Sequence, residues 1–584
     1  MLTAFALALG AWAVPAKKGA ICTVSQQDGS VMRLTVVGDE HNHYYLTTDK
    51  KVVIAANGEY CYASINEKGK VLNSKIKAHA PEKRTAEESA FIEKLSTEVI
   101  VKAIMKAPAE EGVGNSHDGT GQFPNNTFPC TGNVKALVFL VGYSDVPFSE
   151  KSVEYFEKMI TQEGFSENGA TGSCRDFYVD ASNGQFIPEF DVYGPVNLPN
   201  PRSYYGGNDE NGQDSRPEEM MLHAAQLLDN EVDFSQYDTD GDGFVDNVFI
   251  FYAGEGEAAG GGADTVWPHQ WERAFNQKFD GVRLMRYACG PELISPKSKD
   301  GIGTFCHEFG HVLGLPDLYN TYEASADYTP LSWSIMDSGC YNNNSRTPPT
   351  LSAFERNALG WMGDNLIEIK GPATCTLEHI IDSNKAYIIS TPIENEFFIL
   401  ENRQQNGWDK YLAYHGMMIW HIDYNATIWI NNVPNNNESH QCIDLIEACD
   451  RNYPDRLNQR GYPFPGSNMV TEYKFGGSPD FKTWAGENLG LDITDIKEVN
   501  GKITFDVAGG GEDPDAGIST IKYIDASINV SNRTISVSTE GGISIYDLTG
   551  SNIAVGYNSL STAILTPGIY IVRTPISMTK VLVE

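Results

Sequence analysis

The sequence lacks the features of nucleic-acid-binding and membrane-spanning proteins. Lysine and arginine number 43 against 77 aspartate and glutamate residues, which gives a formal net charge of -34. Such a surface repels nucleic acid and anionic lipid, although it can also serve solubility alone. After a short N-terminal run, no segment is long and apolar enough to cross a bilayer. We therefore expect no nucleic-acid partner and no stable membrane insertion.

Closely spaced cysteine pairs are also absent. The ten cysteines include no Cys-x-x-Cys pair, which argues against a zinc ribbon. An even number of cysteines in an exported chain permits disulfide bonds, but the sequence leaves their connectivity open. Hydrophobic residues make up 41% of the chain and aromatic residues 11%, as is typical of a globular protein.

A short apolar run opens the chain. Residues 2–14, LTAFALALGAWAV, have about the length of a signal peptide, although no basic residue precedes them. Small residues fit a cut before Lys17, and a second possible cut follows Ala13. We expect residues 1–16 to be a signal peptide and the protein to be secreted or displayed on a bacterial cell surface.

The rest of the chain is too long for one hydrophobic core, so several domains are expected. Two stretches rich in glycine, aspartate, asparagine or proline are typical of linkers. The patterns between them predict a multidomain α+β protein. Its expected parts are an α+β unit at 17–106, a linker at 107–129, an α/β domain at 130–361, a β-rich domain at 362–508, a second linker at 509–517 and a β-sandwich module at 518–584.

Apolar periodicity predicts where individual elements lie. Strands are expected at residues 31–37, 44–48, 135–143, 247–252, 396–401, 416–423, 502–507, 534–537, 544–546 and 569–572, and helices at 85–105, 152–162, 218–229 and 303–314. The continuous apolar run at 135–143 predicts a strand that is buried on both faces.

A metal site is indicated by HEFGHVLGLPD, residues 307–317. His307 and His311 are one helical turn apart, so both imidazoles can reach one tetrahedral zinc ion. Gly314 permits the chain to turn where other residues would be strained. The chain then returns and presents Asp317 as the third ligand.

Glu308, beside the first histidine, is the expected general base. A zinc ion would supply a Lewis acid that activates water. Glu308 would take the proton of that water and pass it to the leaving amine of a peptide bond. An aspartate in place of a third histidine lowers the net charge of the site and should make the water less acidic.

The same motif resembles that of the metzincin peptidases, in which a tight turn places a methionine beneath the metal. Residues 333–339, WSIMDSG, follow His311 at a fitting distance, with Met336 as that methionine. An ordinary core methionine is the alternative. Several metzincins have a tyrosine two residues later that polarises the substrate, whereas this sequence has Ser338 there and Tyr341 further on.

Longer segments resemble the immune inhibitor A-type, thuringilysin-like peptidases. They are GATGSCRDFYVDASNGQF (169–186), DVYGPVNLP (191–199), DFSQYDTDGDGFVDNVFIFYAGEGEA (233–258), VWPHQW (266–271), CHEFGHVLGLPDLY (306–319), LSAFERNALGW (351–361) and GMMIWHIDYN (416–425). The resemblance covers roughly residues 130–505. It implies a metzincin-like zincin catalytic domain at 130–361, an aspartate third ligand, a removable pro-region at 17–106 and structural calcium.

A calcium loop is expected in DTDGDGFVD, residues 238–246. Oxygen ligands stand at the EF-hand positions 1, 3, 5, 7 and 9, and a glycine stands at position 6. They come from Asp238, Asp240, Asp242, the backbone of Phe244, and Asp246. Position 12 is a phenylalanine, so another carboxylate would have to supply the bidentate ligand. A solvated acidic turn is the alternative.

The C-terminal module resembles the sorting domains of type IX secretion cargo. The matching pieces are YDLTG (546–550), the strand at 568–572 and the terminal KVLVE. The resemblance implies an outer-membrane secretion machinery as a partner. A plain β-sandwich spacer is the alternative.

Together these features predict a secreted zinc metalloendopeptidase, made as a zymogen, that hydrolyses extracellular proteins and peptides. The alternatives are a surface adhesin or binding protein on an inactive peptidase fold, against which the intact Glu308 argues, and a zinc hydrolase of other substrates. The group that blocks the zymogen stays open: His41, His43, Cys22 or Cys61 could do so, or a strand lying across the cleft. A disulfide between the two cysteines is the simpler alternative for them.

Overall fold

The computed structural model describes residues 13–583 apart from 105–127, 450–458, 510–526 and shorter gaps. The shorter gaps are residues 41, 57, 67–68, 210–211, 324–325, 532, 548–551 and 574–577. Contacts divide the chain into two compact units, Met1–Gly510 and Gly511–Glu584. Each of the two predicted linkers, at 107–129 and 509–517, lies mostly outside the described residues.

An antiparallel meander of six strands begins the first unit, and each strand pairs with the next along the chain. The strands are β1 (Ile21–Ser25), β2 (Val31–Val37), β3 (Tyr44–Thr47), β4 (Val52–Ala56), β5 (Glu59–Ile65) and β6 (Val71–Lys77). The expected helical stretch at 85–105 is two helices, α1 (Ala86–Ile92) and α2 (Thr97–Ile104). The Thr85 side chain caps α1 by accepting the N–H of Glu88. Cys22 in β1 and Cys61 in β5 do not form the disulfide that was considered.

A mainly parallel sheet forms the centre of the first unit, in the order β10-β13-β9-β7-β8 with β14 beside β13. The strands are β7 (Gly132–Gly142), β8 (Phe186–Asn197), β9 (Val248–Glu255), β10 (His269–Glu272), β13 (Arg286–Ser295) and β14 (Ser298–Lys299), and a separate hairpin joins β11 (Lys278–Phe279) to β12 (Val282–Arg283). Only β10 and β14 run antiparallel to β13. The class is therefore confirmed in the coarser form of a mixed α/β multidomain protein.

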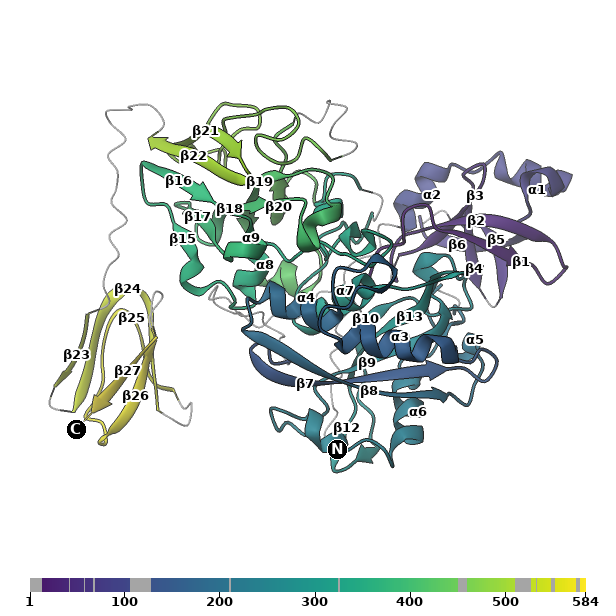
Figure 1. Ribbon diagram of the computed structural model, residues 1–584, viewed down its shortest axis with the longest axis horizontal. Coiled ribbons are helices and arrows are strands. Elements are labelled where there is room, and N and C mark those ends of the chain that lie inside the picture. Colours follow the sequence, from purple (N-terminus) through teal and green to yellow (C-terminus); the bar gives the residue numbers. More distant parts are fainter. Residues whose placement is uncertain are drawn as a thin grey trace. The chain divides into compact units, whose positions relative to one another are not determined.

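Helices cover both faces of this sheet. They are α3 (Glu150–Thr161), α4 (Cys174–Ala181), α5 (Arg202–Gly206), α6 (Glu219–Leu228) and α7 (Ile302–Val312). Figure 1 draws α3, α4 and α7 above β7 and β8, and α6 below them. Right-handed crossovers explain this arrangement, because the chain moves from β7 to β8 in one direction and from β8 back to β9 in the other. Both faces of β7 are consequently buried, as its apolar run predicts.

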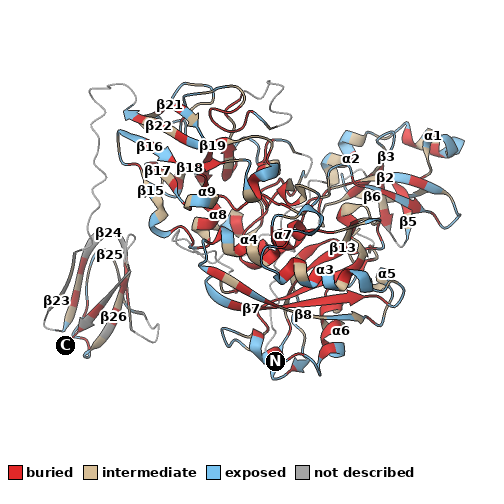
Figure 2. Cartoon of the chain, viewed as in Figure 1, coloured by how far each residue is buried: buried red, intermediate tan, exposed pale blue. Residues whose placement is uncertain are grey.

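Helix α7 is buried along its whole length (Figure 2). A helix that is apolar on all sides belongs in the interior of a large domain. The Phe305 and Phe309 rings stack with centroids 5.5 Å apart, and Phe305 also packs on Phe249 of β9. This aromatic packing fixes the helix that carries the histidine motif against the central sheet.

The β-rich part of the first unit contains two further sheets. One has the order β15-β17-β18-β19-β20 and the other β16-β22-β21. Their strands are β15 (Leu366–Glu368), β16 (Ala373–Leu377), β17 (Ala386–Ser390), β18 (Glu396–Arg403), β19 (Gly416–Asp423), β20 (Ile443–Ile446), β21 (Leu491–Val499) and β22 (Lys502–Gly509). Helix α8 (Ala353–Ala358) ends the central domain, and the helices of the β-rich part are α9 (Ile380–Ser383) and α10 (Ala426–Ile430).

In the second unit, backbone hydrogen bonds join five antiparallel strands into one sheet. Its strands are β23 (Ser527–Ser531), β24 (Thr534–Asp547), β25 (Asn552–Ser561), β26 (Gly568–Arg573) and β27 (Met578–Val583). The strands expected at 534–537 and 544–546 are one long strand, β24, with a register shift between them. The predicted two-layer sandwich is not confirmed.

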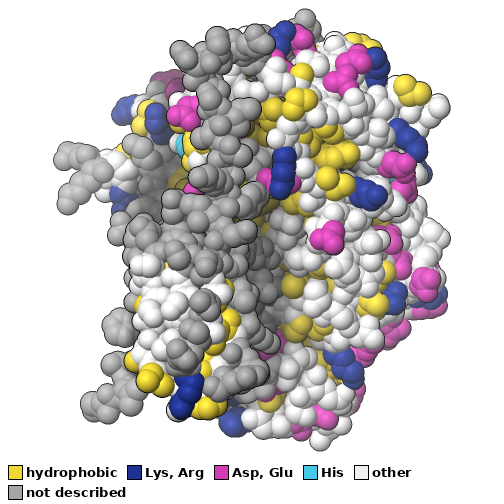
Figure 3. Space-filling model, turned by 90° about the vertical axis from the view of Figure 1, so that its left-hand side faces the viewer, with side chains coloured by type: hydrophobic (Ala, Val, Ile, Leu, Met, Phe, Trp, Pro, Cys, Tyr) yellow, Lys and Arg dark blue, Asp and Glu magenta, His cyan; other side chains and the backbone are white. Residues whose placement is uncertain are grey.

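Charged side chains are scattered over the face of the molecule in Figure 3, where basic groups do not gather into one patch. Across the described residues, no helix is both long enough and apolar enough to span a bilayer.

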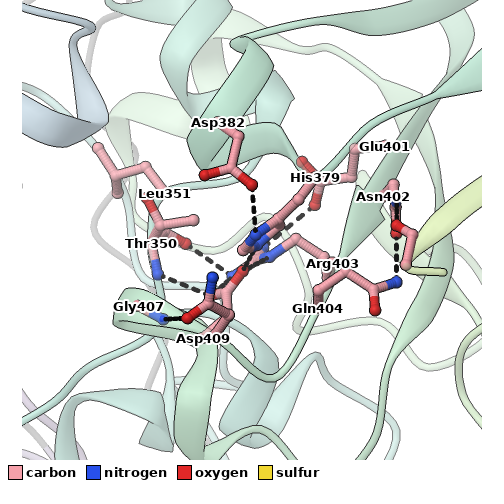
Figure 4. Close-up of polar contacts among 12 residues, drawn as sticks. Thr350, Leu351, His379, Asp382, Glu401, Asn402, Arg403, Gln404, Gly407 and Asp409 are labelled. Carbon is pink, nitrogen blue, oxygen red and sulfur yellow. Dashed lines mark hydrogen bonds and ion pairs between the residues drawn. The ribbon is translucent and has the colours of Figure 1, made fainter.

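A buried ionic cluster joins the segment before α8 to β18 (Figure 4). The Arg403 guanidinium donates to both carboxylate oxygens of Asp409 at 2.6 Å and to Glu401 Oε1 at 3.2 Å. It also donates to the Thr350 carbonyl, while the Thr350 N–H donates to Asp409. Glu401 accepts the N–H of Ala353 at the start of α8. The cluster therefore ties the end of the central domain to the β-rich part.

Removal of Arg403 should destabilise the protein strongly. Burial alone would raise the pKa of Asp409, but the Arg403 guanidinium holds it at about 2. A lowered pKa means that this ion pair stabilises the fold above about pH 4 and that the contribution is lost as the pH falls toward 2. We expect Arg403→Leu to lower the free energy of unfolding by about 3–5 kcal/mol at pH 7, because it leaves Asp409 buried without its cation.

The loss should be smaller at pH 4, since the unpaired Asp409 would then take up a proton. Urea unfolding at the two pH values measures this. Arg33→Leu, at an exposed arginine of β2, is the control and should change stability by less than about 0.5 kcal/mol. A loss for Arg403→Leu as small as that of the control would contradict a structural role of the cluster.

Candidate metal centre

The structure brings the three predicted ligands together in the interior. Asp317 Oδ1 lies 3.1 Å from His307 Nε2 and 3.3 Å from His311 Nε2, and all three side chains are fully buried. The two Nε2 atoms are 3.1 Å apart. The histidines come from α7 and the aspartate from the loop that follows, as the spacing of the motif predicts.

The hydrogen bonds of the two imidazoles show that a cation fits this group. His307 Nδ1 lies 2.7 Å from the Ile335 carbonyl oxygen, and His311 Nδ1 lies 2.7 Å from that of Leu315. A carbonyl oxygen only accepts, so each Nδ1 carries a proton and Nε2 is the ring nitrogen that faces Asp317 and could bind a metal. Asp317 Oδ1 has no hydrogen-bond donor among the described residues. Three lone-pair atoms that face one another in a buried site are the donor set of a metal ion.

Two glycines shape the turn beneath the site. Gly314 has a φ of +97°, a conformation that favours glycine. A Cβ added at Gly310 would lie 2.7 Å from Met336 Sδ, so the fully buried Met336 packs directly against α7. The Leu318 N–H donates to the Met336 carbonyl at 2.7 Å, next to Asp317. Met336 thus packs against the helix that carries both histidines, and its role beneath a metal stays a prediction.

A residue far along the chain orients the carboxylate ligand. Asn432 Nδ2 donates to Asp317 Oδ2 at 2.6 Å, and Asn432 Oδ1 accepts the N–H of Asp317 at 2.6 Å. Trp429 of α10 donates through Nε1 to the Gly314 carbonyl at 3.1 Å. The β-rich part therefore completes the site. Sequence analysis missed Asn432, because no local pattern links it to a motif 115 residues away.

Glu308 lies fully buried beside the ligands. Burial, and after it the nearby Asp317 carboxylate, raise its pKa well above the ordinary value for glutamate. Its Oε1 accepts the backbone N–H of Val14 at 2.9 Å, whereas Oε2 has no hydrogen-bond partner among the described residues. A cation at the site would favour the ionised carboxylate that a general base requires.

The partner of Glu308 belongs to a segment that sequence analysis assigned to the signal peptide. Residues 1–12 lie outside the described part of the chain, but Ala13 and Val14 are 0% and 1% exposed and lie inside the site. The Tyr319 hydroxyl donates to the Ala13 carbonyl at 2.8 Å, and the Tyr341 hydroxyl donates to the Pro15 carbonyl at 2.7 Å. An irregular segment of backbone, rather than a side chain, therefore lies against Glu308 in this structure.

Two of the side chains that could block the site, Cys22 and His43, make their contacts elsewhere. Cys22 donates to the Leu34 carbonyl within its own sheet. His43 stacks on Trp267 with ring centroids 4.9 Å apart, and its Nε2 lies 3.3 Å from Glu257. His41 is outside the described residues. Glu257 of the central domain is fully buried and contacts His43, which follows β2 in the N-terminal sheet. No sequence motif indicates this contact.

The predicted calcium loop gathers three of its carboxylates. Oxygen atoms of Asp238, Asp240 and Asp246 lie within 4.8 Å of one another. Asp242 does not join them, because its carboxylate lies 3.6 Å from the Arg286 guanidinium and accepts the N–H of Phe244. Asp238 Oδ1 is buried and has no hydrogen-bond partner among the described residues. Burial, together with the charges of Asp240 and Asp238, raises the pKa of Asp246 to about 6. The three carboxylates therefore repel one another unless a cation is present.

The comparison with protein families identifies the central domain. Residues 134–365 match the family model of the immune inhibitor A peptidase M6 catalytic domain. This part of the chain resembles a peptidase M6 catalytic domain. The match includes the three ligands, Glu308 and Met336, but ends before Asn432. It confirms the predicted resemblance for this domain, while membership of the metzincin clan and the sorting role of the C-terminal module stay predictions.

Two named relatives agree with the match. The Pre-pro-metalloprotease PrtV of Vibrio cholerae serotype O1 is 25% identical over 335 residues, covering 46% of this chain and 36% of PrtV. Immune inhibitor A of Bacillus thuringiensis subsp. alesti is 29% identical over 290 residues, covering 40% of this chain and 41% of that protein. The matches thus span less than half the length of these relatives.

A solved structure, metalloproteinase-II from Bacteroides fragilis, also matches. It is 11% identical and covers 56% of this chain and 86% of that chain, with a TM-score of 0.21. This TM-score is too low to establish a shared arrangement.

Loss of Asn432 should weaken metal binding. We expect Asn432→Gly to lower the affinity for the metal by about 10- to 100-fold, because the carboxylate of Asp317 loses the amide that orients it. Glycine is chosen because Asn432 has a φ of +56°. Titration of the metal-free protein with zinc under competition from a chelator measures the affinity. Asn500→Gly, at an exposed asparagine with a φ of +53°, is the control, and equal affinities of the two variants would contradict the assigned role.

Proposed function

We propose that the protein is a secreted, zinc-dependent endopeptidase of the immune inhibitor A type, kept latent by its N-terminal unit. The observation that carries this proposal is the buried group of two imidazoles and one carboxylate, with Glu308 beside it and a peptide backbone already lying against Glu308. The peptidase M6 match supports a metal-dependent hydrolase.

The ligand types favour zinc as the metal. His307, His311 and Asp317 supply two nitrogen donors and one oxygen donor, which leaves a fourth tetrahedral position open, as in catalytic zinc sites. When bound, zinc would supply a Lewis acid that activates water. Glu308 then accepts the proton of that water and delivers it to the nitrogen of the leaving amine. Burial of the whole group strengthens each of these electrostatic contacts.

Latency is supported by the contacts of residues 13–17. A substrate cannot reach Glu308 while the Val14 N–H donates a hydrogen bond to its carboxylate. The N-terminal sheet carries this segment, since Ala16 N–H donates to the Gly38 carbonyl. A cut between residues 106 and 129 would separate the sheet from the central domain and let the segment leave. If a signal peptide is removed, a cut after Ala13 would remove less of this segment than one before Lys17.

Two further features complete the proposal. Asp238, Asp240 and Asp246 are proposed to bind a structural calcium ion, with the backbone carbonyl of Phe244 and, once the loop closes, Asp242 as additional ligands. The C-terminal unit is proposed to direct the protein through an outer-membrane secretion machinery, to the cell surface or the medium.

The peptidase activity is tested on the zinc-loaded full chain before and after a nick by trypsin. We expect the nicked protein to degrade denatured casein, a chelator to stop the reaction, and the uncut chain to be at least about tenfold slower. Glu308→Gln should retain zinc and lose about 10²- to 10⁴-fold in rate, because only the proton acceptor is removed.

The control is Glu255→Gln, at a half-buried glutamate of β9, which should keep its activity. Turnover of zinc-loaded Glu308→Gln close to that of the native chain would contradict the assigned base. Equal rates before and after the nick would refute latency. A nicked, zinc-loaded native chain without any hydrolysis would favour the alternative of an adhesin on an inactive peptidase fold.

Calcium should stabilise the protein through the acidic loop. At a calcium concentration of 100 times the Kd, binding to the folded state adds about 2.7 kcal/mol to the free energy of unfolding, which raises Tm. We expect Asp240→Asn to abolish most of this calcium-dependent rise. Asp229→Asn, at an exposed aspartate outside the loop, should keep it. A Tm that does not respond to calcium while zinc stays bound would rule the site out.

A further inference from the structure

The segment from Ala13 to Lys17 shows how a peptide backbone can be held in the site. Its backbone atoms contact four side chains of the central domain, those of Glu308, Tyr319, Trp267 and Tyr341. An inference from these contacts to substrate binding rests on the proposed peptidase function.

One peptide bond lies between two side chains of the central domain. The Val14 N–H donates to Glu308 Oε1 at 2.9 Å, and the Ala13 carbonyl accepts the Tyr319 hydroxyl at 2.8 Å. Because the C=O and N–H of a trans peptide point in opposite directions, Glu308 and Tyr319 stand on opposite edges of the Ala13–Val14 bond. Glu308 thus faces the nitrogen that a cut would release, and Tyr319 faces the oxygen that would become negative.

The next two carbonyls, on the leaving-amine side of this bond, have their own donors. Trp267 Nε1 donates to the Val14 carbonyl at 2.9 Å, and the Tyr341 hydroxyl donates to the Pro15 carbonyl at 2.7 Å. Pro15 has no N–H to satisfy. The Lys17 N–H donates to the Ala258 carbonyl at 2.9 Å. All these contacts use the backbone of the segment, so any peptide in the same place could make them.

The donors are built into the metal centre. Tyr319 follows Asp317 by two residues and is 2% exposed. Tyr341 ends the short 3-10 helix that follows Met336. Trp267 is 1% exposed, and its backbone N–H donates to Asp214 at 2.8 Å.

We propose that Tyr319 is a catalytic residue that donates to the oxygen of the bond being cut, and that Trp267 and Tyr341 hold the two following carbonyls of the substrate. Water adds to the carbonyl carbon, the C–N bond breaks, and Glu308 moves the proton of that water to the released nitrogen. Tyr319 stabilises the negative oxygen of the tetrahedral intermediate. In several metzincins a tyrosine two residues after the methionine polarises the substrate. Here Ser338 stands at that position, and Tyr319 takes over this role.

The alternative is that the three side chains only fix the pro-segment and play no part in turnover. The two roles predict different changes in the rates of the uncut and the nicked chain. If Tyr341 holds both the pro-segment and the substrate, Tyr341→Phe should raise the basal rate of the uncut chain and lower kcat/KM of the nicked one. Misfolding would lower both rates, so opposite signs cannot come from a loss of stability.

The experiment uses the zinc-loaded full chain, nicked by trypsin, and a quenched fluorescent peptide with the sequence Trp-Ala-Val-Pro-Ala-Lys of residues 12–17. Tyr319→Phe should lower kcat by about 10²-fold with KM almost unchanged, as expected for a lost oxyanion donor. Tyr341→Phe should raise KM by about tenfold with kcat almost unchanged, as expected for one lost hydrogen bond. The matched control, Tyr322→Phe, changes a half-buried tyrosine of the loop after Tyr319 and should leave both constants unaltered.

A binding measurement separates this proposal from the peptidase function. In nicked Glu308→Gln, whose amide oxygen can still accept an N–H, calorimetry should show that Tyr341→Phe weakens binding of the same peptide by about tenfold. If the nicked native chain hydrolyses nothing, the proposed function and the role of Tyr319 fail, while the binding data still decide whether Tyr341 holds a peptide. If Tyr319→Phe and Tyr341→Phe match Tyr322→Phe in rate and affinity, the proposal is overturned.

Discussion

The arrangement of this protein depends on one buried group of polar side chains. Two imidazole nitrogens and one carboxylate oxygen, from His307, His311 and Asp317, face one another at 3.1–3.3 Å. Burial of these polar groups costs free energy, and a cation bound between them would offset that cost. The surrounding structure holds the group in place, so the free energy that fixes it comes from the fold and from metal binding together.

Several distant segments supply that support. The Ile335 and Leu315 carbonyls fix the imidazoles, and Asn432 fixes the carboxylate from the β-rich part. The cluster around Arg403 connects the β-rich part to the end of the central domain. The matched peptidase M6 domain ends at residue 365, so part of the environment of the metal lies beyond it. A truncated catalytic domain would therefore lack groups that orient its ligand.

Sequence patterns predict the parts of this structure that depend on local spacing. The 307–317 motif places both histidines on one face of α7 because a helix repeats every 3.6 residues, and the run at 135–143 is the buried strand β7. Tertiary contacts lie beyond such patterns. Asn432 has no distinctive neighbourhood in the sequence, and Asp242 fits the calcium spacing but lies beside Arg286. The apolar character of residues 13 and 14 is shared by signal peptides and by segments that fill a cleft, so composition cannot separate the two.

The central claim is that His307, His311 and Asp317 form one zinc site. Zinc K-edge X-ray absorption on the zinc-loaded full chain tests it most directly. We predict a shell of nitrogen and oxygen atoms at about 2.0–2.1 Å with the outer-shell scattering of two imidazoles, reduced to one imidazole in His311→Ala. A sulfur shell at about 2.3 Å, or a spectrum that His311→Ala leaves unchanged, would contradict the account.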